Sequence, residues 1–483
     1  MLLRDGSIYI VSKVVPGVVS FATAMLLTWL LPARDYGLYG VGMAVIILGN
    51  FALFEWLSHG LGRWYEVHHG DPAFMPTVLT LFAGACLISL VIVIVISATG
   101  VMGDDKRHIW IFLYGIWAHG WFEFAARIQM CSFQPMRFLY MNLVRNGLIL
   151  AGAVLVAKLT RSGEAVLLVS FTAMLLAGSL FMADGTIRLK WVFDVALARA
   201  LLTYGGPIFL SMAFSGLMTS INPVMIETLS SREAVGRYTI AFTLVQSTLG
   251  MVAQGVTATI WPFAVRAIES GDQVEARAQL SRNFTFLFGL MLPAGVGLAL
   301  LAPGIARLFV SPIYHEAIAR MTPWLSTCAV LMALRASYVD TAFQLGKRTG
   351  LLAQVTALGA LVNLALGALL IPRWSYLGAS IAMTCAFATS LVYASILAAR
   401  FYPMPIPLRE AAAIILATAL MGVVVAMALA VPGFFGLLLQ FVSGALTYGV
   451  ALIVLDALGV STVLGGNLMA RLLRGVAARS ISS

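Results

Sequence analysis

Long apolar runs recur along almost the whole chain, and polar residues fall between them in short groups. Each run is close to the ~20 residues that a helix needs to cross the hydrocarbon core of a bilayer. The pattern predicts an all-α polytopic membrane protein with about 14 transmembrane helices joined by short loops. The expected spans are 8–31, 37–61, 76–100, 109–131, 138–159, 165–187, 205–228, 236–264, 283–302, 323–345, 350–371, 377–398, 410–431 and 435–456.

One local pattern occurs twice. The segments LLPARDYGLYG and SSREAVGRY both lead from a polar break into a glycine and a tyrosine. Gly37 and Gly236 are 199 residues apart, and so are Tyr39 and Tyr238. That interval holds about six membrane helices, so we expect two pseudo-symmetric six-helix lobes. The expected organisation is an N-lobe at 1–187, an interfacial linker helix at 188–204, a C-lobe at 205–400, two further helices at 401–456 and a basic cytoplasmic tail at 457–483.

Composition supports a membrane protein. Hydrophobic residues make up 61% of the chain and charged residues 10%, against roughly 25% charged in soluble proteins. The basic residues behind the net charge of +10 are scattered between apolar runs, which fits membrane topology better than a phosphate-tracking patch for nucleic acid. The loops on the N-terminal side carry sixteen Lys and Arg residues against ten on the other side. By the positive-inside rule we expect a multi-pass protein of the plasma (inner) membrane with both termini in the cytoplasm.

Motifs for catalysis and metal binding are absent. The chain has no HExxH, no Walker A sequence and no GxSxG in a plausible context, and its six histidines form no metal constellation. We therefore expect neither an enzyme, nor a cofactor, nor a metal site. The cysteines lie in or at the ends of apolar runs without a CxxC pair, so we expect no disulfide between Cys86, Cys131, Cys328 and Cys385.

Four basic residues fall inside the apolar helices: Lys13, Arg127, Arg145 and Arg335. A charge within the bilayer is costly and usually faces a cavity or a partner. Cations in a membrane cavity suit an anionic substrate such as a phosphate or diphosphate. We therefore predict that these four residues form a cationic substrate-binding cavity that opens to the cytoplasm.

Two charged triplets share the spacing i, i+4, i+8, namely Glu55, His59 and Arg63 in the second helix and His119, Glu123 and Arg127 in the fourth. Four-residue steps place each triplet on one helix face. Two simpler interpretations stay open. Glu123 and Arg127 can form an ion pair that only neutralises itself, and Arg63 can anchor its helix at the interface.

Other polar residues are expected to support the cavity. Asn142 and Asn146 flank the predicted cation at position 145, and Asn222 precedes a proline at a candidate hinge. Asp340 follows Arg335 by five residues, which places it on roughly the opposite side of a regular helix. We expect Asp340 to pair with another helix.

Several segments together resemble the polysaccharide (oligosaccharide) flippase family of the multidrug/oligosaccharidyl-lipid/polysaccharide exporter superfamily. The first is LLPARDYGLYG, and the second lobe adds YGGPIFLSMAFSGLMTSINPVMIETLSSREAVGRY, EARAQLSRNFTFLFGLMLPAGVGLALLAPGIARLF and QLGKRTGLLAQVTALGALVNLALGALLIPRWSYLGASIA. The similarity covers most of residues 1–400. It rests on the order and spacing of these segments, because each one mainly encodes helix ends and packing.

The resemblance implies a V-shaped pair of lobes that work by alternating access. The implied substrate is a polyprenyl-diphosphate-linked oligosaccharide moved from the inner to the outer leaflet, and the implied partners are the bilayer, a polysaccharide polymerase and a chain-length regulator. A parallel six-helix repeat agrees with this, since both lobes then have the same orientation. The family's cationic cavity maps by analogy onto the four intramembrane cations.

Three alternatives stay open. A peptidoglycan lipid-precursor flippase and a cation-coupled multidrug exporter would share the fold, although the exporter should carry isolated acids in its first or seventh helix, where this chain offers only Asp5 and Glu227 at the edges. The third is a membrane enzyme or scaffold of polysaccharide assembly. An enzyme would need a large external loop, and the longest one, 303–322, is short.

Overall fold

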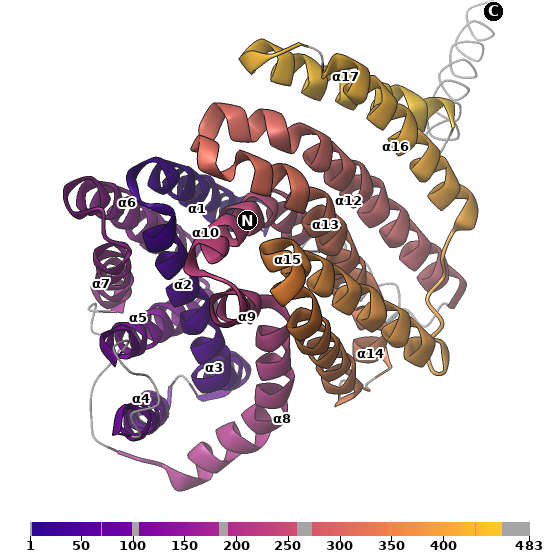
Figure 1. The fold of residues 1–483 in the computed structure, drawn as a ribbon. Helices are drawn as coiled ribbons and strands as arrows, with labels where there is room; N and C mark the ends of the chain where they lie inside the picture. The colour runs from indigo at the N-terminus through magenta and orange to yellow at the C-terminus, as the bar shows by residue number, and fades with distance from the viewer. Residues whose placement is uncertain are drawn as a thin grey trace, which may run out of the picture.

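The computed structural model describes residues 2–68, 70–98, 106–182, 192–257, 273–346, 348, 350–429 and 431–455, and within them the chain is built from helices (Figure 1). By length and composition, ten of the described helices are able to cross a membrane, which confirms a polytopic helical protein; the number of about 14 spans stays a prediction. The first half contains α1 (Leu2–Leu30), α2 (Ala33–Leu53), α3 (Glu55–His68), α4 (Phe74–Ala98), α5 (Lys106–Cys131), α6 (Pro135–Thr160) and α7 (Gly163–Met182). The second half contains α8 (Val195–Ser220), α9 (Asn222–Leu229), α10 (Arg232–Val245), η2 (Gln246–Gly250), α12 (Gln273–Phe309), η3 (Pro312–Tyr314), α13 (His315–Leu334), η4 (Arg335–Val339), α14 (Asp340–Leu345), α15 (Gly350–Ala399), α16 (Leu408–Ala428) and α17 (Gly433–Val454).

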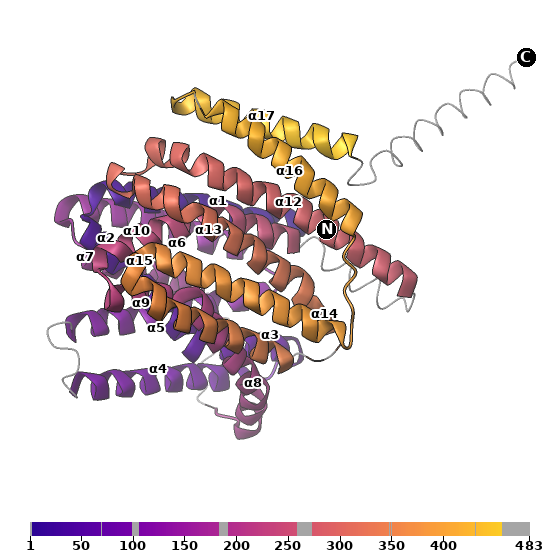
Figure 2. The same ribbon diagram turned by 45° about the vertical axis from the view of Figure 1, so that its right-hand side comes forward.

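The helices of the first half pack mainly on one another. α6 lies between α1 and α7, and α5 packs against α7, α2 and α3. Aromatic side chains fill the centre of this bundle, with Phe54, Phe122 and Phe171 almost completely buried. α4 contacts α3, α5 and α8 at the edge of the molecule (Figures 1 and 2). Leu87 and Val91 of α4 are exposed, as expected for a helix with one face in lipid.

The second half forms a second group of helices. α13 packs against α12, α10 and α15, and α15 packs against α8. The backbone of α15 leaves the helical region at Ser375, and Phe401 after its second arm returns to within 5.4 Å of the Phe343 ring, centroid to centroid. α15 is therefore a hairpin of two arms (Figure 2). α16 and α17 pack on each other and on α12, at the edge of the molecule opposite α4.

α2 joins the two halves, and the repeated motif lies at the contact. α2 packs against α8, α9 and α10. A Cβ atom added to Gly37 would lie 1.8 Å from the carbonyl oxygen of Arg232, and one added to Gly236 would lie 2.8 Å from the carbonyl oxygen of Ala33. The two contacts are equivalent, because Gly37 and Gly236 are 199 residues apart and so are Ala33 and Arg232. The two copies of the motif therefore meet each other about a local two-fold axis, and the absence of side chains lets the backbones touch.

A third contact lies on the same axis. A Cβ atom on Gly40 would lie 2.1 Å from Oγ1 of Thr239, which is the residue 199 positions later. Each motif also has local support. Asp35 accepts a hydrogen bond from the backbone N–H of Gly163 at the start of α7 (2.9 Å), and Arg232 pairs with Glu227 (Nη2 to Oε1, 2.5 Å).

Four of the predicted single spans contain an irregularity. The span 37–61 is divided at Phe54 into α2 and α3, and the span 205–228 is divided at Ile221 before α9. The spans 236–264 and 323–345 contain the π-helical turns η2 and η4. α8 begins at Val195, inside the range predicted for a linker helix, and runs on without a break to Ser220. The predicted tail at 457–483 lies outside the described residues.

Candidate functional site

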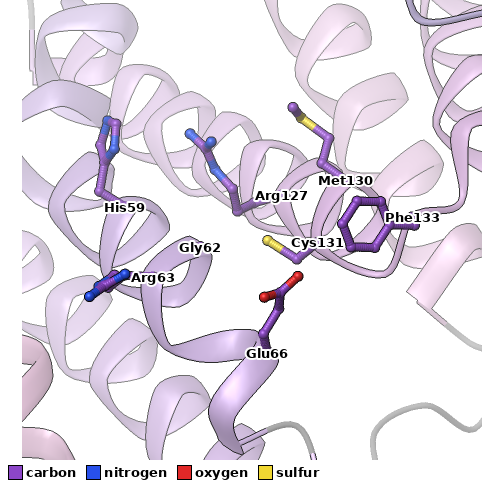
Figure 3. A pocket seen from close by; sticks show the side chains of 8 residues that line it. All are labelled: His59, Gly62, Arg63, Glu66, Arg127, Met130, Cys131 and Phe133. Atoms are coloured by element: carbon purple, nitrogen blue, oxygen red, sulfur yellow. The ribbon is translucent and has the colours of Figure 1, made fainter. Parts of the chain in front are cut away.

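Two charged stripes face each other between α3 and α5. On α3 the stripe contains Glu55, His59, Gly62, Arg63 and Glu66, and on α5 it contains His119, Glu123, Arg127, Met130 and Cys131. Steps of three and four residues place each set on one face of its helix, which is the arrangement predicted from the triplets. α3 and α5 pack together. Figure 3 shows side chains from both stripes around a common space.

The centre of the arrangement is one shared carboxylate. Oε1 of Glu55 lies 3.5 Å from Nε2 of His59 and 3.7 Å from Nη2 of Arg127. Oε2 of Glu55 accepts a hydrogen bond from Nδ2 of Asn50 at the end of α2 (3.3 Å). Arg127 thus forms its ion pair across helices with Glu55, rather than along its own helix with Glu123.

A pocket of about 450 Å³ opens beside this pair, near the helix ends that carry the α3–α4 and α5–α6 turns. Its lining residues are His59, Gly62, Arg63, Glu66, Arg127, Met130, Cys131 and Phe133 (Figure 3). Gly62 lies against this space, where an added Cβ would make ordinary van der Waals contact with Cδ of Arg127 at 3.8 Å. Tyr65 and Ser132 hydrogen bond side chain to side chain (2.7 Å) and tie α3 to the α5–α6 turn.

Three residues that line the pocket were not predicted as site residues, namely Arg63, Glu66 and Cys131. For the first two, helical spacing in the sequence would have indicated the same face. Arg63 completes the predicted triplet, and its exposed side chain lines the pocket as well as lying near the helix end. Glu66 lies eleven residues after Glu55, which is three helical turns and returns to the same face. The spacing that identified Glu55 and His59 therefore extends along the same face of α3 to Arg63 and Glu66.

Arg145 of α6 joins the same charged cluster. Its guanidinium carbon lies 4.3 Å from the centroid of the Phe122 ring, a cation–π contact. The negative charge of Glu123 interacts electrostatically with Arg145 and with His119. His119 also interacts electrostatically with Glu55. Nε of Arg145 is buried without a hydrogen-bond partner, and no carboxylate of the described residues lies within ion-pair distance of this guanidinium.

The predicted supporting asparagines of α6 have a local role. Nδ2 of Asn142 donates to the carbonyl of Phe138, and Nδ2 of Asn146 donates to the carbonyl of Asn142, both at 2.9 Å. Both side chains are buried. These bonds satisfy the amides against their own helix, so the two residues support the shape of α6 around Arg145.

Arg335 lies in a different environment from Arg127 and Arg145. Its Nη1 donates to Oγ of Ser390 (3.1 Å) and contacts Sδ of Met218 (3.4 Å), and its Nε donates to Oδ2 of Asp340 (3.4 Å). The residue is only 7% exposed. Its guanidinium also lies 5.7 Å from the centroid of the Phe387 ring. Arg335 thus connects η4 to α8 and α15 within the second half.

The expectation that Asp340 pairs with another helix is wrong. Arg335–Val339 form the π-helical turn η4, and a π turn closes i→i+5 hydrogen bonds. The wider turn rotates Asp340 toward the arginine five residues before it, where a regular α-helix would place it nearly opposite. The two charges of this segment therefore neutralise each other.

Asn222 lies at the junction of α8 and α9, where it is completely buried. Its Nδ2 donates to the hydroxyl of Tyr238 (3.3 Å), which in turn contacts Sδ of Met383 (3.4 Å). The predicted hinge residue thus holds α9, α10 and α15 together.

Lys13 lies on α1, and its side chain falls outside the described part of the structure. Among the described residues, no group of three or more His, Cys, Asp or Glu side chains is arranged to hold a metal ion. The four cysteines are unpaired.

Known proteins of the same fold are membrane transporters. The structure of the lipid II flippase MurJ in an inward closed conformation superposes with a TM-score of 0.72 at 14% identity, covering 95% of this chain and 100% of that one. An inward-facing multidrug resistance MATE family transporter of the MOP superfamily gives 0.60 at 15% identity, covering 80% of this chain and 95% of that one. An outward-facing MATE transporter gives 0.54 at 13% identity, covering 82% and 94%.

No curated protein sequence matches this chain. A family model described as polysaccharide biosynthesis protein matches residues 26–319, which is more than half of the sequence. This range begins in α1 and ends in α13, so it contains both copies of the repeated motif and the whole charged cluster of α3, α5 and α6. The chain therefore belongs to this polysaccharide biosynthesis protein family, and it shares its fold with the MurJ and MATE structures.

Proposed function

We propose that this protein moves a polyprenyl-diphosphate-linked oligosaccharide from the inner to the outer leaflet of the plasma membrane, for the assembly of a surface polysaccharide. The observation that carries the proposal is Arg145, a guanidinium inside a membrane-spanning helix that has no carboxylate of the described residues within ion-pair distance, while Glu123 acts on it from farther away. Such a cation is costly unless it faces a partner or a cavity. A diphosphate supplies the missing negative charge.

The pocket beside α3 and α5 suits that ligand, although Arg145 itself is not among its lining residues. Arginine binds phosphate oxygens through two parallel N–H bonds, which fixes the anion as well as attracting it. Arg127 and Arg63 add further positive charge on the facing stripes. The pocket of about 450 Å³ lies within the range of sites for small ligands, roughly 300–1,000 Å³. It has room for the head group, while the polyprenyl chain stays in lipid.

Transport then follows from movement of two lobes. We assign residues 1–187 and 205–400 to these lobes and place both termini in the cytoplasm, so that the pocket end of α3 and α5 faces the inner leaflet. The head group enters there. The two lobes then part at the contact between α2 and α10, which exposes the same side chains on the other side, and no covalent bond is made or broken. A polysaccharide polymerase and a chain-length regulator are the expected partners of the released product.

The proposal is tested by transport in proteoliposomes. The purified protein is reconstituted with a labelled polyprenyl-diphosphate-linked oligosaccharide, and the lipid that reaches the opposite leaflet is measured with a membrane-impermeant glycosidase. We expect Arg145→Gln to lower the initial rate by at least about tenfold, because a charge-assisted pair to phosphate contributes more than 1.4 kcal/mol, and Arg145→Lys to retain part of it.

The matched control is Arg320→Gln, which removes one positive charge from an exposed ion pair with Glu316. This variant should transport at the wild-type rate. Wild-type transport by Arg145→Gln would contradict the assignment of the site. No transport by the wild-type protein would contradict the proposed substrate.

A lipid-linked peptidoglycan precursor is the second candidate substrate. The observation that favours it is the similarity in fold to a lipid II flippase over 95% of this chain, against 80% for a multidrug transporter. The same proteoliposomes separate the two candidates when they are loaded with lipid II in place of the oligosaccharide lipid. The proposal requires the oligosaccharide lipid to move faster.

A further inference from the structure

Glu55 occupies the position that an anionic ligand of Arg127 would take. Its Oε1 lies 3.7 Å from Nη2 of Arg127. Among the carboxylates of the described residues, Glu55 is the one within ion-pair distance of Arg127. The Arg127 side chain is 29% exposed and lines the pocket, whereas the Glu55 side chain is 18% exposed and lies behind it. A ligand that enters the pocket therefore meets an arginine whose charge is already shared.

Carboxylate and phosphate oxygens accept the same hydrogen bonds from a guanidinium. A diphosphate that binds Arg127 in full must therefore weaken its contact with Glu55. A carboxylate left without a partner in a low-dielectric region would be costly, so the alternative contacts of Glu55 decide whether the exchange is feasible.

Glu55 has two such contacts. His59 lies on the next turn of α3, and its Nε2 is 3.5 Å from the same oxygen that faces Arg127. Nδ2 of Asn50 donates to the other oxygen at 3.3 Å. Both partners stay in place when Arg127 turns toward a ligand, because neither depends on the arginine. Glu55 can thus release Arg127 without becoming isolated.

We propose that Glu55 is an internal competitor of the substrate: it holds Arg127 in the empty protein, is displaced by the diphosphate, and returns to Arg127 as the substrate leaves. This inference rests on the proposed function, since it assumes that the pocket takes a diphosphate. It assigns Glu55 the role of a positioning residue that sets affinity and release.

The position of Glu55 connects the exchange to the fold. Glu55 is the first residue of α3, directly after the interruption at Phe54, and Asn50 belongs to the last turn of α2. α2 is the helix that packs against α8, α9 and α10 of the second half. α3 also packs against α8 of the second half. Displacement of the carboxylate therefore acts at the joint between two helices that both contact the other half.

The test is a double-mutant cycle on diphosphate binding. Farnesyl diphosphate is the probe, and its dissociation constant is measured by calorimetry on the purified full-length protein at neutral pH. We expect Glu55→Gln to bind about fivefold tighter than wild type, the effect of removing a partly exposed competing ion pair. Arg127→Gln should bind more weakly, and Glu55→Gln should give no gain when Arg127→Gln is already present.

Two further variants guard the interpretation. Glu55→Asp keeps the charge on a shorter side chain and should bind closer to wild type than Glu55→Gln does. Glu316→Gln, which removes an exposed carboxylate elsewhere, should leave the dissociation constant unchanged, so that net charge alone is not the cause. The unfolding temperature of each variant shows that it is folded.

The outcomes separate the inference from the proposed function. If Arg127→Gln weakens binding but Glu55→Gln does not tighten it, the internal competitor is wrong and the diphosphate site stands. If neither variant changes binding, the assignment of the pocket to a diphosphate is wrong as well. A gain from Glu55→Gln that persists in the Arg127→Gln background would also overturn the competition with Arg127.

Discussion

Arginine side chains in this protein are accommodated within membrane-spanning helices in two ways. Arg335 is enclosed by a carboxylate, a hydroxyl, a thioether and an aromatic ring of its own half. Arg145 has an aromatic ring beneath it and no carboxylate of the described residues within ion-pair distance. The first arrangement satisfies the charge, and the second leaves it available for a ligand.

Because Arg335 is paired and Arg145, within the described residues, is not, we expect changes around Arg335 to affect stability and changes at Arg145 to affect transport. Asp340→Asn leaves Arg335 buried without its counter-ion, which should cost about 3 kcal/mol and lower the unfolding temperature in detergent by several degrees. The double variant Arg335→Met/Asp340→Leu removes both charges and should recover most of the loss. Transport per folded molecule should survive in the double variant. Loss of transport there, with stability intact, would return Arg335 to the predicted substrate site.

The site could be predicted from the sequence where its helices are regular α-helices, and not where a π-helical turn changes the number of residues per turn. The i, i+4, i+8 spacing correctly placed Glu55 and His59 on one face, because α3 is a regular helix. That the face turns toward α5 could not be predicted, because the spacing places the residues on one face of a helix and does not say which neighbour that face meets. The pair between Arg335 and Asp340 was missed, since the spacing argument assumes 3.6 residues per turn and η4 departs from it.

At the scale of elements, glycine determines how closely α2 and α10 approach. The carbonyl of Arg232 occupies the space of a side chain on Gly37, and the carbonyl of Ala33 does the same for Gly236. Small residues permit such close contact between membrane helices, where packing replaces the hydrophobic effect as the driving force. The apolar runs predicted the helices themselves because lipid requires about 20 apolar residues for each crossing. They did not predict the interruption at Phe54, since neither proline nor glycine stands next to it to mark a break.

We expect Gly37→Ala to separate this contact, because the new Cβ would lie 1.8 Å from a backbone oxygen that has no rotamer to change. The measurement is the rate at which a membrane-impermeant maleimide labels Thr239→Cys, with the four native cysteines replaced by serine. Oγ1 of Thr239 is buried at present. Labelling should accelerate about tenfold, the response to a shift of ~1.4 kcal/mol between closed and open states.

Gly84→Ala is the matched control, since a Cβ at Gly84 of α4 meets nothing within 4 Å. It should leave the labelling rate unchanged and add a little helix stability, roughly 0.5–1 kcal/mol. Equal labelling in the Gly37→Ala variant would show that the α2–α10 contact does not hold this end closed.

For the whole molecule, the α2–α10 contact is where two bodies must part if the protein alternates between two openings. The contact joins helices from the two halves of the sequence, and α16 and α17 lie far from it on α12 (Figure 1). A covalent link between α2 and α10 would hold the halves together. It would not contact the pocket, which lies near the C-terminal end of α3.

A disulfide tests this movement. Cysteines at Gly40 and Thr239 would be close enough to join after a small adjustment, as the Cβ positions are 3.0 Å apart. In the cysteine-free background we expect the oxidised Gly40→Cys/Thr239→Cys protein to lose transport and to regain it on reduction. The control pair Gly152→Cys/Val169→Cys joins α6 to α7 within one half and should transport when oxidised. Normal transport by the oxidised first pair would exclude rocking at this contact.

The meeting of Gly40 with Thr239 bears on how such a chain could arise. Two positions separated by the repeat interval that touch each other must lie on the axis that relates the two halves. In a dimer of identical ancestral subunits the same residue would have faced itself there, either as two threonines that collide or as two glycines that leave a gap. Fusion of a duplicated gene would remove that constraint, because one copy could keep its side chain while the other lost it. A glycine that faces a threonine across the axis is thus possible in a single chain but not in a dimer of identical subunits.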